Sequence, residues 1–218
     1  MSLHLQRDLE ALKKELLQLG NLVETAIDTS ILSLHNREPA LAERVMEIEV
    51  EINEKEVHIE EECLKMLALH QPVAVDLRFI VAVLKVDNDL ERMGDFAKNI
   101  AKRAQVLAQL PPMPVSPAFV NELPDLVRTM VRKSLDAMVA LDVDLARNVI
   151  KTDKRVDEIN ANMYGEVQKL IEEDVTRTEG ALNLLSCSRH MERIADLSTN
   201  IAEDVLFMVE GKVMRHMG

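Results

Sequence analysis

The chain is short of aromatic residues, cysteine and long apolar runs, and each shortage excludes a class of protein. With no Trp, one Tyr and four Phe, it offers little on which nucleotide bases could stack. Its two cysteines, Cys63 and Cys187, belong to no Cys-x-x-Cys motif, so neither a disulfide framework nor a zinc finger is indicated. The longest apolar run spans residues 79–84, whereas a membrane span needs about 20 residues. Residues 1–10 are polar and charged, unlike a secretory signal. We therefore expect a cytoplasmic protein with no direct membrane insertion.

Basic residues are also in short supply. The chain has 26 Lys and Arg against 38 Asp and Glu, which gives a net charge of −12. Proteins that bind nucleic acid hold its phosphates with clustered Lys and Arg, so no nucleic-acid partner is expected. An acidic surface suits a soluble protein that binds other proteins or cations.

Proline and glycine divide the chain into helix-length segments. Pro39 and Pro72 fall at gaps in the apolar periodicity, where each can occupy a first helical turn. Residues 111–117 contain four prolines in seven positions and indicate a linker between a first unit, 1–110, and a second, 118–218. The apolar spacing predicts six helices, at 3–36, 39–69, 73–108, 118–141, 144–173 and 178–212.

The two units are copies of each other. The apolar stripe of the helix at 73–108 recurs in the helix at 178–212 at a constant offset of 101 residues, as from Val86 to Cys187. The helices at 39–69 and 144–173 are related by an offset of 104, as from Val45 to Val149. The sequence therefore predicts an all-α protein of six long helices, built as two tandem three-helix bundles related by an internal repeat.

Paired carboxylates recur at the same places in both copies. Glu91 and Asp95 lie one turn apart on one helix face, and Glu192 and Asp196 repeat them with the same neighbouring Arg and Asn. Each Glu follows a core position by one residue, which places it at the edge of the packed face. The partner helices carry two further pairs at matching positions, Glu49 with Asn53 and Asp153 with Asp157. We expect these side chains to converge into two acidic grooves.

Crowded carboxylates raise one another's pKa, and a cation relieves the repulsion. Oxygen ligands with few imidazoles favour Mg²⁺, Ca²⁺, Mn²⁺ or iron over copper or structural zinc. A single acidic pair is more often a solvated helix face, but repetition in register favours a ligand role. Arg92 and Arg193 each follow the Glu by one position, so we expect them to point away from the acids.

Other metal sites and motifs are disfavoured. No His has an acid three residues before it, as a ferritin-like di-iron centre requires. His58 and His190 are expected to be exposed helical residues. No phosphate loop, H-E-x-x-H or G-x-S-x-G motif is present, and no catalytic residue is predicted.

The order and spacing of these motifs resemble the PhoU family of phosphate-uptake regulators over essentially the whole chain. The resemblance rests on 71–78 (QPVAVDLR), 90–95 (LERMGD) and 99–101 (NIA), and in the second copy on 153–157 (DKRVD), 191–196 (MERIAD) and 200–202 (NIA). It implies bundles whose acidic pairs hold clusters of metal ions, among which iron, manganese, zinc, nickel and magnesium are candidates. Carried over, the metal ligands are Glu49, Asn53, Glu91, Asp95, Asp153, Asp157, Glu192 and Asp196, with Asp87, Asn99 and Asn200 as further candidates.

The resemblance also implies partners. It predicts a negative regulator of phosphate uptake and phosphate-starvation signalling. Such a protein is an adaptor between the ATPase subunit of the phosphate ABC transporter and the sensor histidine kinase of the phosphate regulon, peripheral to the inner membrane through them. The sequence does not decide whether the protein forms a homodimer. Asn53 departs from the acidic pattern, so we expect the first site to hold metal more weakly than the second.

Two alternatives remain beside this interpretation. A carboxylate-bridged metal cluster can hydrolyse phosphate esters, which would make the protein a metal-dependent phosphoester hydrolase. The acids can also be a solvated face only, on a metal-free helical adaptor for another phosphate carrier.

Overall fold

The structure is a computed structural model that describes residues 3–210, and it contains six long helices. They are α1 (Leu3–Asn36), α2 (Pro39–His70), α3 (Ala74–Gln109), α4 (Leu123–Ala140), α5 (Val143–Glu173) and α6 (Thr178–Glu210). A π-helical segment, η1 (Ala118–Glu122), leads into α4, and a 3₁₀ turn, η2 (Val175–Arg177), joins α5 to α6. The six predicted helices are confirmed, except that residues 211–212 of the last one lie outside the described residues.

Local chemistry explains where the helices begin and end. Pro39 occupies the first turn of α2, where its missing N–H costs no hydrogen bond. The Asp142 carboxylate caps α5 by accepting a hydrogen bond from the Leu145 N–H at 2.9 Å. Gln71 and Leu141 adopt left-handed backbone conformations, with φ of 45° and 53°, directly after α2 and α4.

The sequence did not predict the π-helical start of the fourth helix. There the Leu123 N–H bonds to the Ala118 carbonyl, five residues earlier. Pro124 follows directly and has no N–H to continue the usual ladder. A wider turn at this point is a common adjustment to such a break.

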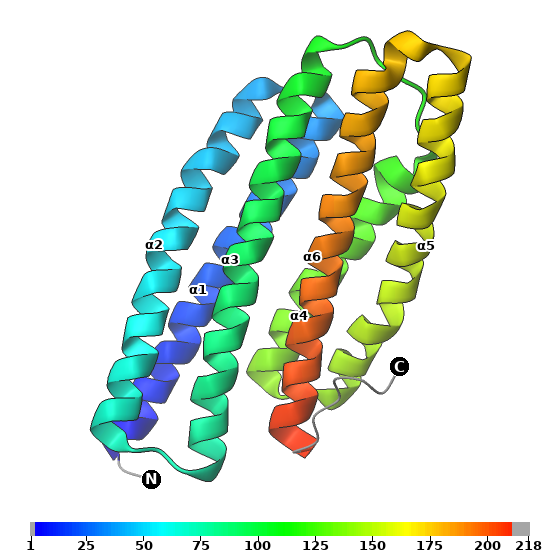
Figure 1. Ribbon diagram of the computed structural model, residues 1–218. Coiled ribbons are helices and arrows are strands. Elements are labelled where there is room, and N and C mark those ends of the chain that lie inside the picture. Colours follow the sequence, from blue (N-terminus) through cyan, green and yellow to red (C-terminus); the bar gives the residue numbers. More distant parts are fainter. Residues whose placement is uncertain (1–2, 211–218) are drawn as a thin grey trace.

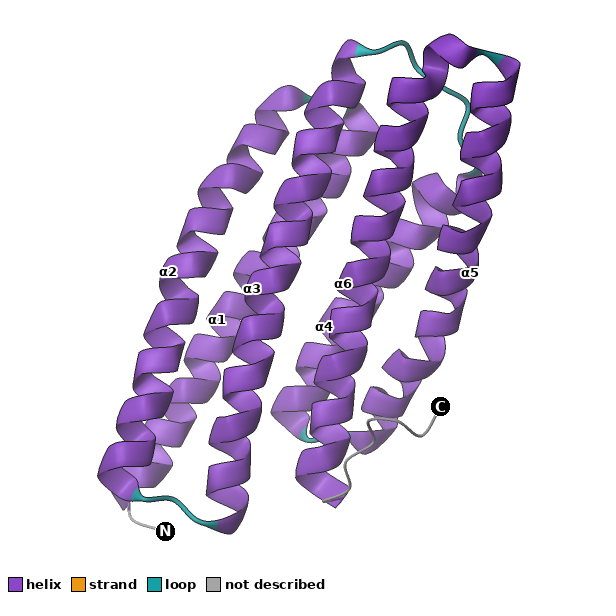
Figure 2. Cartoon of the chain, in the orientation of Figure 1, coloured by secondary structure: helices purple, strands orange, loops and turns teal. Residues whose placement is uncertain are grey.

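Each repeat forms a three-helix bundle, and the two bundles stand side by side. Helices α1, α2 and α3 pack on one another, as do α4, α5 and α6. Figure 1 shows α3 and α6 adjacent at the centre and running in opposite directions, with α2 and α5 at the outer edges. Figure 2 shows that short loops join the helices and that no strand is present within residues 3–210.

The predicted apolar stripes form the core. Every stripe residue of α3, from Val86 to Leu107, is buried, and so is every stripe residue of α6, from Cys187 to Met208. The edge position predicted for the acids follows from this, because the neighbouring positions are rotated by about 100° out of the packed face.

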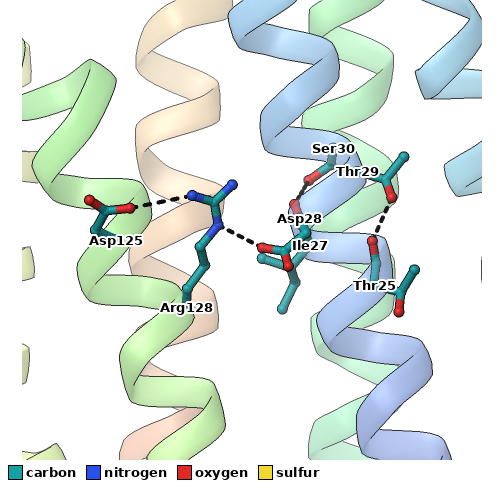
Figure 3. A network of polar contacts seen from close by, with 7 residues as sticks. All are labelled: Thr25, Ile27, Asp28, Thr29, Ser30, Asp125 and Arg128. Atoms are coloured by element: carbon teal, nitrogen blue, oxygen red, sulfur yellow. Dashed lines mark hydrogen bonds and ion pairs between the residues drawn. The ribbon is translucent and has the colours of Figure 1, made fainter.

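Polar contacts tie the two repeats together along two seams. Between α3 and α6, Lys85 Nζ lies 2.8 Å from a carboxylate oxygen of the buried Asp204. Behind them, Arg128 of α4 bridges Asp28 of α1 at 2.6 Å and Asp125 at 3.3 Å (Figure 3). No helix within residues 3–210 is both long and apolar enough to cross a membrane.

The prediction that His190 is exposed is wrong. Its ring stacks on Phe96 across the α3–α6 seam, with ring centroids 5.7 Å apart, and it is only partly exposed. Phe96 and His190 lie 94 residues apart in the sequence, so no local pattern indicated the contact. His58 is exposed, as predicted.

Candidate metal centre

Three carboxylates converge in the second repeat, between α5 and α6. Asp153, Asp157 and Asp196 each offer an oxygen within 4.8 Å of the others. Asp153 and Asp157 lie one turn apart on α5, and Asp196 faces them from the middle of α6. The edges of the two helices therefore meet as the repeat pattern predicted.

Asp153 has a buried carboxylate oxygen, Oδ1, without a hydrogen-bond partner among the described residues. Burial, and then the charges of Asp157, Asp196 and Glu192, raise its pKa to about 6. Burial and neighbouring carboxylates also raise the pKa values of Glu192 and Asp196. The predicted upward pKa shifts are confirmed in this repeat.

This donor set fits a hard or borderline divalent cation. The three ligands supply only carboxylate oxygens, which Mg²⁺, Mn²⁺ and ferrous iron accept. A cation would also supply the partner that Asp153 Oδ1 lacks. Among residues 3–210 this is the one place where three acid, His or Cys side chains bring ligand atoms so close together.

The corresponding place in the first repeat has a different chemistry. Glu49 is 7% exposed, and one of its carboxylate oxygens accepts hydrogen bonds from Lys98 Nζ at 2.7 Å and from the Asn53 amide at 3.0 Å. Burial by itself would raise the pKa of Glu49, but these two hydrogen bonds, with the charges of Lys98 and Lys102, outweigh it and leave the pKa below its usual value. We expected some of the crowded acids to have raised pKa values, and Glu49 is not one of them.

Lys98 was missed because its role depends on tertiary structure. An exposed-looking lysine on an acidic helix gives no signal of its own. Its counterpart at the offset of 101 is Thr199, whose hydroxyl bonds its own helix at the Ala195 carbonyl. Comparing the two copies position by position would have shown that only the first carries a cation here.

Glu91 and Asp95 of the first repeat do not complete a three-ligand cluster with Glu49 within residues 3–210. Glu91 is partly buried, and burial followed by the charges of Asp95, Glu56 and Glu49 raises its pKa. Asp95 is exposed. No set of three ligand atoms gathers around them within residues 3–210.

Asp87, a secondary candidate, is nearly inaccessible. It is 1% exposed, and its Oδ1 finds no hydrogen-bond partner among the described residues. Burial and the charges of Glu56, Glu60 and Glu91 raise its pKa to about 8. Sequence reasoning overlooked Glu56 and Glu60 as its neighbours.

In the second repeat the positions equivalent to Asp87, Glu56 and Glu60 carry uncharged residues. Ser188 replaces Asp87 and donates a hydrogen bond to the Asn160 side-chain oxygen at 2.9 Å. The remaining candidates, Asn99 and Asn200, are partly buried on α3 and α6. The metal-ligand assignments as a whole stay predictions.

The expectation that both arginines point away from the acids is wrong for Arg193. Its guanidinium lies 3.7 Å from Glu192 and 3.5 Å from Asp196. The long side chain reaches the acid one turn further along the helix, which rotation angles at the Cα atom do not capture. Arg92 contacts Asp89 instead, at 3.7 Å.

Comparison with known proteins identifies the family. The family model described as PhoU domain matches this chain twice, at residues 16–104 and 120–205. The chain belongs to the PhoU family. The two matches coincide with the two three-helix repeats, so the tandem duplication read from the sequence is a duplication of the PhoU domain.

Relatives match over nearly the whole chain. A Pseudomonas putida protein described as "Phosphate-specific transport system accessory protein PhoU homolog" is 38% identical over 97% of this chain and 82% of its own length. The Escherichia coli accessory protein PhoU is 32% identical over 97% of this chain and 87% of its own. The crystal structure of PhoU from Pseudomonas aeruginosa superposes with a TM-score of 0.92 at 37% identity, covering 95% of this chain and 99% of that one.

Proposed function

We propose that this PhoU-family protein is a non-catalytic regulator of phosphate uptake that links the phosphate transporter to a sensor kinase. Its relatives are described as accessory proteins of the phosphate-specific transport system. The partners would be the ATPase subunit of the phosphate ABC transporter and the sensor histidine kinase of the phosphate regulon. Two three-helix bundles in one chain offer separate surfaces for two partners.

A divalent metal ion in the second repeat is part of the proposal. The observation that supports it is the buried, unpartnered Oδ1 of Asp153 beside Asp157 and Asp196. A cation at this place would cancel the repulsion among the three carboxylates. It would also join the edge of α5 to the middle of α6.

The regulatory role is tested in cells. Deleting the gene should raise expression from a phosphate-starvation promoter in phosphate-rich medium, and restoring the wild-type gene should lower it again. Co-purification of the ATPase subunit and of the kinase with the tagged protein tests the adaptor function directly. Normal repression in the deletion strain would contradict the regulatory proposal.

The metal is tested separately by elemental analysis of purified, tag-free protein. We expect bound transition metal or Mg²⁺ in the wild type and its loss from Asp157→Asn, Asp196→Asn. The control is Asp144→Asn, on the same helix α5. The Asp144 side chain is 98% exposed, so the change removes a carboxylate that lies away from the site. Equal metal content in all three proteins would contradict the site.

A further inference from the structure

A polar hollow of about 250 Å³ lies on the seam between α3 and α6. Its lining includes two arginines, Arg92 from α3 and Arg193 from α6, together with Thr199 and Asn200. This volume is large enough for a small hydrated ion, since one bound water molecule needs only about 10–15 Å³. The carboxylate of Asp196 also lines the hollow, which therefore combines the donors of two arginines with one acid.

The duplication explains why two arginines meet there. Arg92 and Arg193 occupy equivalent positions in the two repeats, and α3 and α6 run in opposite directions (Figure 1). Equivalent residues of two antiparallel helices come together only where the helices cross near their midpoints. Both arginines are central in their helices, as are the acids beside them. The pair of guanidinium groups is thus a feature of the assembled chain that neither repeat has alone.

The contacts of these arginines with nearby acids are long. Arg92 lies 3.7 Å from Asp89, and Arg193 lies 3.5 Å from Asp196 and 3.7 Å from Glu192. The two side chains are 52% and 55% exposed. A guanidinium carries five N–H donors in a planar fork, so long contacts of this kind leave each one able to bind a further acceptor. Paired arginines of this type favour planar or tetrahedral oxyanions.

A nucleotide is a poor fit to the same place. Phe96 is the one aromatic side chain in the lining, and its ring already stacks on His190. The hollow contains no second ring to hold a base. The chemistry points to a small, highly charged anion with several acceptor oxygens.

We propose that Arg92 and Arg193 bind inorganic phosphate in this hollow, and that neutralising the adjacent Asp196 strengthens the binding. Asp196 lines the hollow and also belongs to the candidate metal centre. Its negative charge repels an anion held by the arginines as long as no cation is bound. By linkage, whatever neutralises Asp196 raises phosphate affinity, and phosphate raises the affinity for that cation by the same factor. This second half rests on the proposed metal centre, but the arginine site does not.

The arginine site is tested by equilibrium dialysis of radiolabelled inorganic phosphate against the metal-free protein. We expect Arg92→Gln, Arg193→Gln to weaken binding by at least about 100-fold, because two charged donors are lost. The matched control is Arg44→Gln, Arg147→Gln. It removes the same net charge from side chains of similar exposure, 57% and 50%, that pair with acids elsewhere, and it should bind phosphate as the wild type does.

A neutral side chain at Asp196 separates the two halves of the proposal without any metal. In metal-free protein, Asp196→Asn should bind phosphate about fivefold more tightly than the wild type, and Asp144→Asn should leave the affinity unchanged. Failure of the wild type to bind phosphate at millimolar concentration, or equal affinity in the two arginine double variants, would overturn the site. Unchanged affinity in Asp196→Asn would overturn the coupling, whatever the metal analysis shows.

Discussion

In the first repeat Lys98 donates a hydrogen bond to Glu49, whereas Thr199 at the equivalent position of the second repeat bonds its own helix, and Oδ1 of Asp153 finds no donor within residues 3–210. Both repeats bring the same helix edges together and place acids on them. The pKa of Glu49 is lowered and that of Asp153 is raised to about 6. The comparison teaches that the duplicated acidic motif forms a candidate metal centre in the repeat where no lysine bonds to the acid on the partner helix.

The comparison sharpens the expected difference in metal affinity between the sites. The sequence attributed a weaker first site to Asn53, which brings no charge. The structure adds a second cause, because Lys98 and the Asn53 amide both donate to Glu49. An ammonium group at a carboxylate competes with a metal ion for the same oxygen atoms.

The largest effect is expected from moving the lysine. Thr199→Lys should place an ammonium group near Asp153 and weaken metal binding by about 1,000-fold, since like charges at close range cost several kcal/mol. Isothermal titration calorimetry with the metal ion measures the change in affinity. Thr199→Gln, which is long but neutral, should retain most of the affinity. If the two variants bind metal equally, the charge of residue 98 does not explain the difference between the repeats.

Replacing Asp87, the buried acid of the first repeat, should give the next largest effect, a change in the free energy of unfolding. The folded-state pKa of Asp87 is raised to about 8, so folding favours its protonated form. Its contribution to stability is present in full below the unfolded pKa and is lost as pH rises toward 8. Asp87→Asn should therefore be more stable than the wild type at pH 8 by about 2–4 kcal/mol and nearly equal at pH 4.

Urea denaturation of the metal-free proteins at the two pH values measures this difference. Asp87→Ser copies the residue found at the same place in the second repeat and is the control for side-chain size. A stability gain that does not depend on pH would show that Asp87 is not protonated on folding.

Removing the lysine should have a smaller effect. Lys98→Met keeps the length of the side chain but leaves the buried Glu49 with one donor fewer, at a cost of about 2 kcal/mol of unfolding free energy. Because the pKa of Glu49 is lowered in the folded state, this loss should be complete above its unfolded pKa and should fade as pH falls through the folded value. Lys154→Met, on an exposed position of α5, is the control, and an equal loss in both variants would argue against the ion pair.

The smallest effect is expected at Asp153. Asp153→Asn should stabilise the metal-free protein at neutral pH by about 1 kcal/mol, after allowing for solvent screening of a partly exposed group. It should destabilise the protein, relative to the wild type, once saturating metal is added. Thermal denaturation with and without metal measures both. A variant that is less stable than the wild type in both conditions would contradict an unpartnered carboxylate at this place.

Much of the fold could be read from the sequence, because helices are specified by spacing along the chain. The stripes from Val86 to Leu107 and from Cys187 to Met208 repeat every three or four residues, and a residue's place on a helix face follows from that count. The same arithmetic placed Glu91 and Asp153 at the edge of the packed face. It failed at Pro124, where a missing N–H changed the hydrogen bonding over the preceding turn.

What the sequence determined by itself is the six helices, their duplication and the faces that carry acids, since all three depend on local periodicity. Tertiary structure alone decided that Lys98 reaches Glu49, that His190 stacks on Phe96, and that Arg92 and Arg193 meet. These contacts join residues on different helices, and their geometry depends on how the helices cross and how far each side chain extends. Long side chains such as Lys and Arg reach across a helix–helix seam to partners that no count along one helix can identify.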